Sequence, residues 1–298
     1  MWKYLEYVED YRALLATRRD SRYMDYPFKV SFETLTLCNA ICDFCPYPSL
    51  TRKGTMMSDS LIAKIIDECR SIPSDLPLQI VPLRVNEPFL DKRIFDICQH
   101  IGDTLPNATI PLFSNGSPLN PPNLSKLAGL ENIALLVISL HDHRPDVYER
   151  VMGLPLARTL RNLEGLHELK AAGAIKFPVT ISRVGDGSSF DEEFCRWGRE
   201  RFPLFTVYST ARANWMGAVD TLVSPVPQVG CGQWFDINIL ADGKVAFCCI
   251  DSDARFGSGN AAEEHLLEIY NRPARRRLRQ ELRNRGEIPE CANCSLLS

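Results

Sequence analysis

The sequence lacks any long run of apolar residues. A membrane-spanning helix needs about 18 or more consecutive apolar residues, and no such window occurs among the 298 residues. The first twenty residues, MWKYLEYVEDYRALLATRRD, also lack the apolar core of a secretory signal, because acidic residues interrupt them. They predict an amphipathic helix instead. We therefore expect a cytoplasmic protein with no membrane partner.

An excess of charge of either sign is also missing. The 37 acidic and 34 basic residues leave a formal net charge of -3, so no bulk field would attract nucleic acid or an anionic membrane. Internal repeats and low-complexity linkers are absent as well. With 45% hydrophobic residues, the chain can bury a substantial core, and its length allows one large globular domain and a small one.

Cysteine, in contrast, is abundant. Eleven cysteines, an odd number, without a secretion signal argue against a disulfide framework and favour metal or redox chemistry. Three of them fall between positions 38 and 45 and five between 231 and 294, clustered as ligand sets require. Cys69, Cys98 and Cys195 lie apart from these clusters in helix-like stretches. A free cysteine often behaves as a small hydrophobe, so we expect these three to be buried thiols.

Six strand-like runs alternate with helix-like runs through the first two thirds of the chain. Segments 58–70 and 156–172 have the apolar spacing of helices, and Gly173 is a typical signal for the end of the second. Repeated βα units predict a parallel sheet covered by helices, and six of them suit a partial (β/α)6 version of the TIM-type barrel. Functional residues should then follow the strands. The six runs are KVSFETLT, LQIVPLRV, TIPLF, ALLVISL, KFPVTISRV and LFTVYST.

The pattern changes after Gly217. FDINIL, Asp242-Gly243 and VAFCC predict a β-hairpin, because Asp-Gly suits the positive φ angles of a tight turn. A helix is predicted from about residue 263 to 285, before the CANC segment. We therefore expect a partial barrel with an N-terminal helix at 1–217 and a small domain of β-hairpin plus helix at 218–298.

Three cysteines, Cys38, Cys42 and Cys45, form a C-x3-C-x2-C pattern directly after the first predicted strand. Three thiolates on one loop can hold three irons of a 4Fe-4S cluster and leave the fourth iron without a protein ligand. A structural zinc site would normally need four ligands, and the loop has no histidine or fourth cysteine. The spacing favours the cluster, with zinc or an incidental grouping as the alternative.

This loop resembles that of the radical S-adenosylmethionine superfamily, which also has an aromatic residue before the third cysteine. Further matches follow the next strands in order: VNEPFLD, FSNG, ISLHD and TISR. The resemblance implies S-adenosylmethionine at the cluster and an external electron donor such as a flavodoxin or ferredoxin. It implies that Glu87 contacts the methionine amino group and Arg183 the cofactor carboxylate. The implied cofactor contacts are Phe44, Glu87, Ser114, Asn115, Ser139 and Arg183.

Each single match also has a simpler interpretation. Glu87 could merely cap the helix that follows Pro88, and Asn115-Gly116 could be an ordinary turn. In addition, Asn86 stands where the family usually has glycine. The superfamily assignment rests on the joint order of the matches, one at each strand end.

A second set of four cysteines lies near the C-terminus and resembles the SPASM domain or its shortened twitch form. The lead-in ARANWMG belongs to this resemblance. Full SPASM domains carry more cysteines, so the resemblance implies one auxiliary 4Fe-4S cluster and two clusters in all. A zinc site is the alternative. The implied ligands are Cys231, Cys248, Cys291 and Cys294.

One cysteine, Cys249, is left over next to Cys248. Neighbouring residues on a strand point to opposite faces, so the two should not bind the same cluster. We expect a free thiol beside the cluster, with a second buried apolar thiol as the alternative. Such a thiol could return a hydrogen atom to a substrate radical, which favours an epimerase. An auxiliary cluster that accepted an electron would instead give a dehydrogenase.

The chain length, the single auxiliary cluster and the cysteine pair resemble radical S-adenosylmethionine epimerases of aminoglycoside antibiotic biosynthesis. This resemblance implies an isomerase that inverts one carbon of an aminoglycoside, with Cys249 as catalytic residue. A dehydrogenase of an aminoglycoside intermediate, a peptide-modifying maturase and a non-enzymatic iron-sulfur scaffold remain alternatives. Carboxylates in plausible loops could hold the polycationic substrate, although each could equally be a solvated surface group: Glu33, Asp142, Asp186, Asp251 and Asp253.

Overall fold

A single curved sheet organises the fold. The structure is a computed structural model that describes residues 2–220, 226–294 and 296. Eight strands in this part of the chain pair in the order β6-β5-β4-β3-β2-β1-β7-β8. Every pair is parallel except β7–β8. The strands are β1 (Lys29–Phe32), β2 (Leu78–Val81), β3 (Ala108–Ser114), β4 (Ile133–Ser139), β5 (Val179–Gly185), β6 (Thr206–Ala211), β7 (Asp236–Ile239) and β8 (Val245–Ala246).

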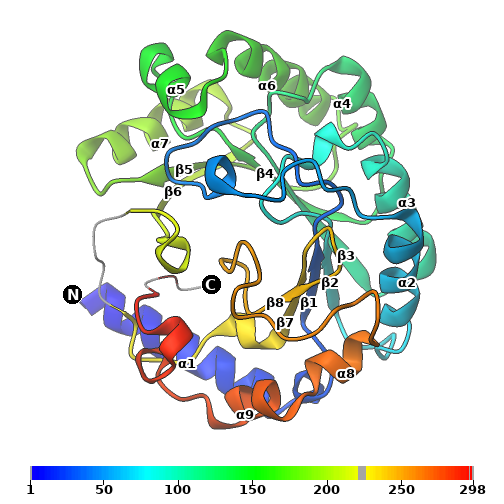
Figure 1. The fold of residues 1–298 in the computed structure, drawn as a ribbon. Coiled ribbons are helices and arrows are strands. Elements are labelled where there is room, and N and C mark those ends of the chain that lie inside the picture. The colour runs from blue at the N-terminus through cyan, green and yellow to red at the C-terminus, as the bar shows by residue number, and fades with distance from the viewer. Residues whose placement is uncertain (1, 221–225, 295, 297–298) are drawn as a thin grey trace.

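Helices surround the sheet on its outer side (Figure 1). The six predicted strands are confirmed as β1 to β6, and the predicted helix at 58–70 is confirmed as α2. The Ser58 hydroxyl accepts a hydrogen bond from the Leu61 N–H and so caps α2. The helices are α1 (Trp2–Arg19), α2 (Asp59–Cys69), α3 (Ile94–Thr104), α4 (Pro121–Ala128), α5 (Pro145–Met152), α6 (Leu156–Ala171), α7 (Ser189–Arg201), α8 (Leu266–Tyr270) and α9 (Pro273–Glu281).

The main core lies between the sheet and these helices. Val30, Ile80, Ile110 and Ile181 are fully buried, as expected for strands of a parallel sheet that is covered on both faces. Cys69 and Cys98 are buried in this core, which confirms two of the three predicted thiols.

The prediction is wrong for Cys195, which is only half-buried. It lies on α7, next to the edge strand β6, and faces a surface groove together with Ser209 of that strand. Most β6 side chains are exposed. The helix therefore lacks a neighbour that would cover this side.

The C-terminal hairpin continues the barrel sheet. It forms as predicted from β7 and β8, with Gly243 at φ +89° in the turn. The whole of β7 also pairs with β1, from Lys29 opposite Asp236 to Phe32 opposite Ile239. The division of the chain at residue 217/218 stays a prediction.

The prediction of one continuous helix from about residue 263 to 285 is wrong. It is divided into α8 and α9 at Asn271 and Arg272. Pro273 explains the break, because proline lacks the N–H that an interior helical position needs but is well suited to the first turn. The second helix then ends at Leu282, which has a left-handed φ of +45°.

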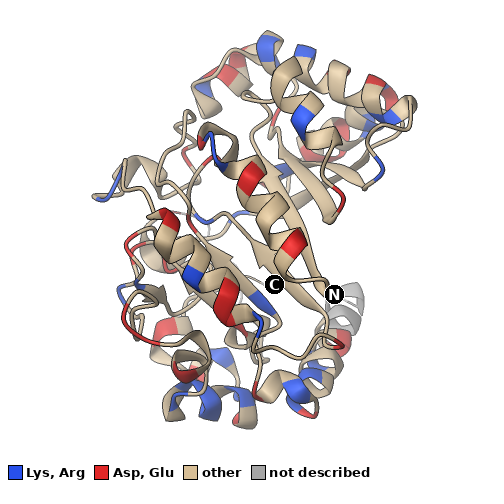
Figure 2. Ribbon diagram, turned by 90° about the vertical axis from the view of Figure 1, so that its right-hand side faces the viewer, with Lys and Arg blue, Asp and Glu red and all other residues tan. Residues whose placement is uncertain are grey.

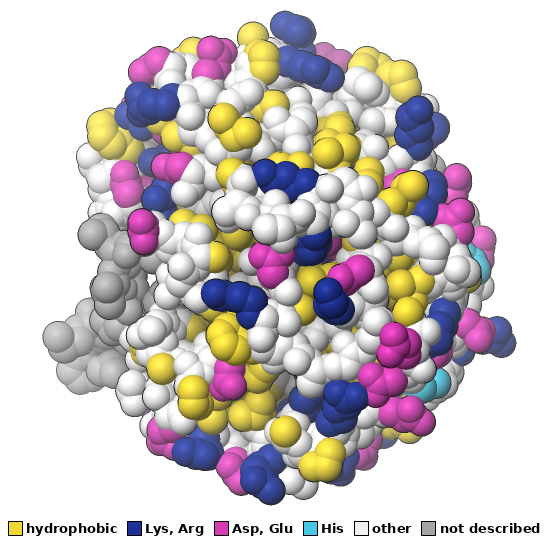
Figure 3. Space-filling model, in the orientation of Figure 1, with side chains coloured by type: hydrophobic (Ala, Val, Ile, Leu, Met, Phe, Trp, Pro, Cys, Tyr) yellow, Lys and Arg dark blue, Asp and Glu magenta, His cyan; other side chains and the backbone are white. Residues whose placement is uncertain are grey.

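Charged side chains of both signs are interspersed along the outer elements (Figure 2) and over the face seen in Figure 3. This agrees with the near balance of acidic and basic residues in the sequence. Within residues 2–220, 226–294 and 296, no helix is both long enough and apolar enough to span a bilayer.

Candidate active site

A cavity of ≈ 400 Å³ lies at the carboxyl ends of the barrel strands. Loops after β1, β2, β3 and β4 form its walls, together with the ends of β5 and β6. This is the edge of a β/α barrel at which functional side chains collect. The segment that carries Cys249 and Ile250 closes the cavity from the C-terminal part of the chain.

The three cysteines of the first loop, Cys38, Cys42 and Cys45, all line this cavity. The backbone N–H of Ala40 lies 3.4 Å from the Cys38 sulfur, and the side-chain amide of Asn115 lies 4.0 Å from it. Burial raises the pKa of Cys38 to about 12. Burial thus favours the protonated thiol of Cys38, and bound iron would stabilise its thiolate by balancing the charge. Three thiols on one cavity wall fit the cluster site that the sequence predicted.

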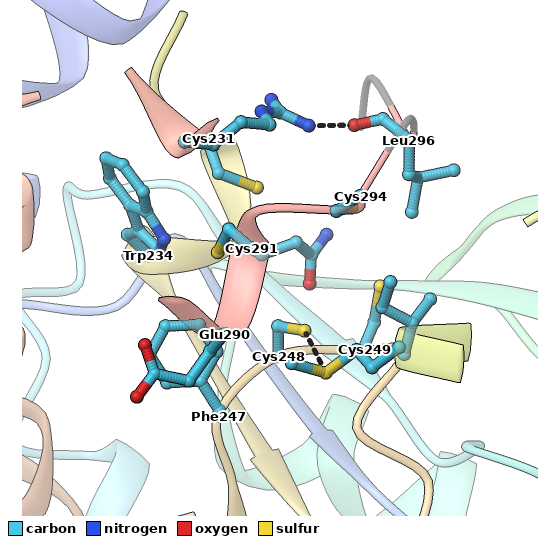
Figure 4. A pocket seen from close by; sticks show the side chains of 13 residues that line it. Cys231, Trp234, Phe247, Cys248, Cys249, Glu290, Cys291, Cys294 and Leu296 are labelled. Carbon is cyan, nitrogen blue, oxygen red and sulfur yellow. Dashed lines mark hydrogen bonds between the residues drawn. The ribbon is translucent and has the colours of Figure 1, made fainter. Parts of the chain in front are cut away.

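A second group of cysteines lines a smaller pocket beside the first cavity. Figure 4 shows Cys248 and Cys249 as neighbours, with Cys231, Cys291 and Cys294 above them in the view. The structure thus brings the four predicted ligands to one pocket from three places: the turn after β8, the segment before β7 and the CANC segment.

The surroundings of this pocket fit an iron-sulfur cluster. Burial raises the pKa of Cys291 to about 12, and a side-chain hydrogen bond from Trp234, which lies beside it in the pocket wall, offsets part of that rise. A donor at this place would also stabilise the negative charge of a cluster ligand. Among the described residues, no three Cys, His, Asp or Glu side chains converge on one point where a single ion could bind.

Glu87 ties the end of β2 to the end of β3. Its buried carboxylate accepts hydrogen bonds from the Ser114 hydroxyl (2.9 Å) and the Asn115 backbone N–H (2.7 Å). It also accepts one from the Phe89 N–H (3.3 Å), so the capping role considered for this residue is present too. Burial raises the pKa of Glu87 to about 7. An ammonium group bound in the cavity would keep this carboxylate ionised.

The other predicted cofactor contacts except Arg183 also line the cavity: Phe44, Ser114, Asn115 and Ser139. Asn115 donates from its side-chain amide to Asn39 (2.8 Å), which joins the β3 end to the cysteine loop. Gly116 has a φ of +77°, so the turn considered at this place also forms. Phe44 packs edge-on against the His141 ring, with the ring centroids 4.4 Å apart.

Arg183 points elsewhere. Its guanidinium pairs with Asp142 (2.8 Å) and Asp191 (2.7 Å) and donates to the His141 carbonyl. It does not line the cavity, whereas the adjacent Val184 does. Contact between Arg183 and a cofactor carboxylate stays a prediction.

The five carboxylates proposed for the substrate do not line the cavity. Glu33 is buried and paired with Arg52, and Asp142 is paired with Arg144 and Arg183. Asp251 is buried and accepts hydrogen bonds from backbone N–H groups, and Asp253 pairs with Arg52 (3.2 Å). Asp186 is exposed and accepts from Ser188. Among the residues described, Glu87 is the carboxylate that lines the cavity.

Cys249 borders both the large cavity and the smaller cysteine pocket, whereas Cys248 borders the pocket alone. The strand argument used for this pair is wrong, because β8 ends at Ala246 and both cysteines follow it. They lie in a turn that is closed by the Asp251 N–H donating to the Cys248 carbonyl (3.2 Å). Burial raises the pKa of Cys249 to about 12. The thiol therefore keeps its hydrogen at neutral pH.

Comparisons with known proteins agree with this arrangement. Residues 231–295 match the family model of SPASM, an iron-sulfur cluster-binding domain. Two solved structures share the fold. BtrN, in complex with AdoMet and 2-DOIA, has 18% sequence identity, a TM-score of 0.65 and coverage of 91% of this chain and 94% of that one. Streptococcus suis SuiB bound to precursor peptide SuiA has 13% identity, a TM-score of 0.68 and coverage of 92% and 70%.

The SPASM match decides what the C-terminal part is. Residues 231–295 belong to the SPASM family of iron-sulfur cluster-binding domains. The predicted resemblance, the mixed α/β class and an iron-sulfur cofactor are thereby confirmed, and the BtrN structure that shares this fold holds AdoMet.

A curated relative of this chain is the probable GTP 3',8-cyclase of Thermococcus kodakarensis (strain ATCC BAA-918 / JCM 12380 / KOD1). It is 27% identical over 158 residues, which cover 52% of this chain and 48% of the relative. The match thus spans about half the length of that protein.

His141 and Arg84 also line the cavity, and neither of them was predicted from the sequence. His141 follows β4 with a left-handed φ of +66°, and its Nδ1 accepts from the Val184 N–H (3.1 Å). Burial, followed by the nearby Arg183, lowers the pKa of His141 to about 3, so the ring is neutral. Arg84 follows β2 and is also buried. His141 lies within ISLHD and Arg84 within PLRVNEP. A charged or titratable residue inside a strand-end motif was therefore the sequence signal that could have placed both residues in the cavity.

Proposed function

We propose that this enzyme is an epimerase in which Cys249 returns a hydrogen atom to the substrate radical. The observation that carries the proposal is the position of Cys249. Its side chain borders the cavity that contains the three-cysteine loop and also borders the auxiliary cysteine pocket. A hydrogen donor must reach the substrate, and the sulfur radical that remains on the donor must then be reduced. A position between the cavity and the auxiliary cysteine pocket suits both requirements.

The chemistry balances as follows. S-adenosylmethionine held at the first cluster would take one electron, delivered to that cluster by an external donor, and release methionine; the resulting 5'-deoxyadenosyl radical would remove a hydrogen atom from a substrate C–H bond and become 5'-deoxyadenosine. Cys249 then breaks its S–H bond and gives that hydrogen to the opposite face of the carbon radical, which completes the inversion. The sulfur radical left on Cys249 takes up one electron and one proton to become a thiol again. The electron comes from an external donor, for which we propose a flavodoxin or ferredoxin.

For the substrate we propose an aminoglycoside. The chain length, the single auxiliary cysteine set and the Cys248–Cys249 pair resemble neomycin C epimerase, which inverts one carbon of the terminal amino sugar to make neomycin B. A large aminoglycoside would extend beyond the cavity. Asp186, which is exposed, and Asp253, whose side chain is 35% exposed, are the proposed carboxylates that such a part could reach most easily.

The test uses reconstituted enzyme and neomycin C in heavy water. Thiol hydrogens exchange with solvent, so the product should carry one deuterium at the inverted carbon. The Cys249→Ser variant should still form 5'-deoxyadenosine but should lose the inverted product. A matched control is Cys195→Ser, because this thiol lies away from both pockets. An oxidised product without solvent deuterium would favour the dehydrogenase instead.

A further inference from the structure

The turn that carries Cys249 is held at both ends by one barrel residue. Arg84 donates from both terminal nitrogens to the Cys248 carbonyl (3.3 Å each) and from Nη2 to the Asp251 carbonyl (3.0 Å). These carbonyls belong to the first and last residues of the turn. The planar guanidinium of Arg84 thus bridges the two ends of the segment that carries the thiol.

A second arginine, Arg52, holds the next residues of the same segment. It donates to the Ser252 carbonyl (2.6 Å) and pairs with Asp253 (3.2 Å). It is anchored to the barrel through Glu33, whose other carboxylate oxygen accepts from the Val85 N–H (3.3 Å) beside Arg84. Both arginines therefore rest on the same barrel edge, at the ends of β1 and β2.

Burial of Arg84 is difficult to explain by stability alone. The residue is 9% exposed, and its side-chain hydrogen bonds go to neutral carbonyl groups, while the Glu33 carboxylate acts on it only through space. Its Nε has no hydrogen-bond partner among the described residues. A buried charge without full compensation destabilises a fold, and an apolar side chain of similar size would often serve better. What the guanidinium provides is a fixed geometry between two carbonyls.

We propose that Arg84 is a positioning residue for hydrogen return, which keeps the Cys249 turn against the cofactor cavity, with Arg52 as its second support. This inference rests on the proposed donor role of Cys249. Arg84 acts through the Cys248 and Asp251 carbonyls and does not exchange hydrogen itself. Loss of this hold lets the thiol move away from the substrate radical, which then decays without inversion.

The test is Arg84→Lys in the full-length, reconstituted enzyme. An ammonium group keeps the charge but cannot bridge both carbonyls as a planar guanidinium does. The ratio of inverted product to 5'-deoxyadenosine should fall by roughly ten-fold to a hundred-fold, because displacement of a reacting group by about 1 Å can cost about that much. Hydrogen exchange of the backbone amides in residues 247–256 should also become faster, a readout that is independent of turnover.

Arg279→Lys is the matched control. Arg279 is also buried, also donates to two carbonyls, those of Tyr270 (3.0 Å) and Met24 (3.1 Å), and also has an unpartnered Nε. These partners lie outside the Cys249 turn. The control should lose thermal stability, while its product ratio and its exchange in residues 247–256 stay at wild-type values. An equal fall of the ratio in Arg279→Lys would overturn the proposal.

Arg52→Lys provides a second variant in case Arg84→Lys does not fold. It should change the same two readouts in the same direction. Wild-type ratio and wild-type exchange in the folded variants would refute the positioning role. If Cys249→Ser still makes inverted product, the donor role fails, while faster exchange in Arg84→Lys would still show that the arginine holds the turn.

Discussion

Glu87 combines two tasks within one buried carboxylate. It accepts hydrogen bonds from Ser114, Asn115 and Phe89, and thereby holds two strand ends together. It also faces the cavity in which the cofactor is expected. Burial raises its pKa to about 7 because the charged form loses hydration, and the three hydrogen bonds offset only part of that loss.

The raised pKa predicts a pH dependence of stability. The folded state holds the Glu87 proton up to about pH 7, whereas the unfolded state releases it near pH 4.5. Stability should therefore fall as pH rises through this window, by on the order of 3 kcal/mol at most. Thermal unfolding of the reconstituted enzyme, measured from about pH 5 to pH 8, should show this fall. Glu87→Gln should weaken it, and the exposed control Glu131→Gln should not.

The same residue gives a check on cofactor binding. If the methionine amino group contacts Glu87, S-adenosylmethionine should reduce the pH dependence, because an adjacent ammonium group favours the carboxylate. An equal pH dependence with and without the cofactor would count against that contact.

At the scale of elements, most strands and helices can be predicted from the residue pattern within a single segment. The strands β1 to β6 and the capped helix α2 were predicted because apolar periodicity and capping residues lie within single segments. The α8–α9 break could have been predicted too, since Pro273 was visible.

Pairings between distant segments were not predictable in this way. Glu33 pairs with Arg52 across the long segment between β1 and α2, and Asp142 pairs with Arg183 of β5. The β1–β7 ladder joins residues 207 positions apart, as for Lys29 and Asp236. One sequence contains no signal for such contacts. The members of each cysteine set do lie in one pocket, and their role as cluster ligands stays a prediction. Of the expected substrate carboxylates, Glu33, Asp142 and Asp253 have arginine partners within the protein.

The β7–β8 turn offers a test at this scale. Gly243 has a φ of +89°, and a Cβ there would lie 2.4 Å from the Asn260 side-chain oxygen. Gly187 has a similar φ of +79° but open space around it. Gly243→Ala should therefore lower the free energy of unfolding by more than the about 1–2 kcal/mol expected for the backbone conformation alone in Gly187→Ala. Iron analysis should also show lower occupancy of the auxiliary cluster in Gly243→Ala only.

For the whole molecule, the two cysteine sets predict two separable clusters. Substitution of Cys38, Cys42 and Cys45 together by Ala should remove about half of the iron and sulfide, since one 4Fe-4S cluster would remain. Cleavage of S-adenosylmethionine should be lost with it. Cys195→Ala is the control and should keep both properties. Zinc in place of the remaining iron, or iron content equal to wild type, would contradict the assignment.

The ladder between β1 and β7 has a consequence for electron transfer. The strand β1 leads into the loop with Cys38, and β7 leads through the hairpin to Cys248. Backbone hydrogen bonds join these two strands side by side, so no hinge separates the two redox centres. The tunnelling distance between them is restrained by the sheet and by the loops that carry the cysteines. Rigid-body movement of the hairpin against the barrel should therefore not gate electron transfer across this gap.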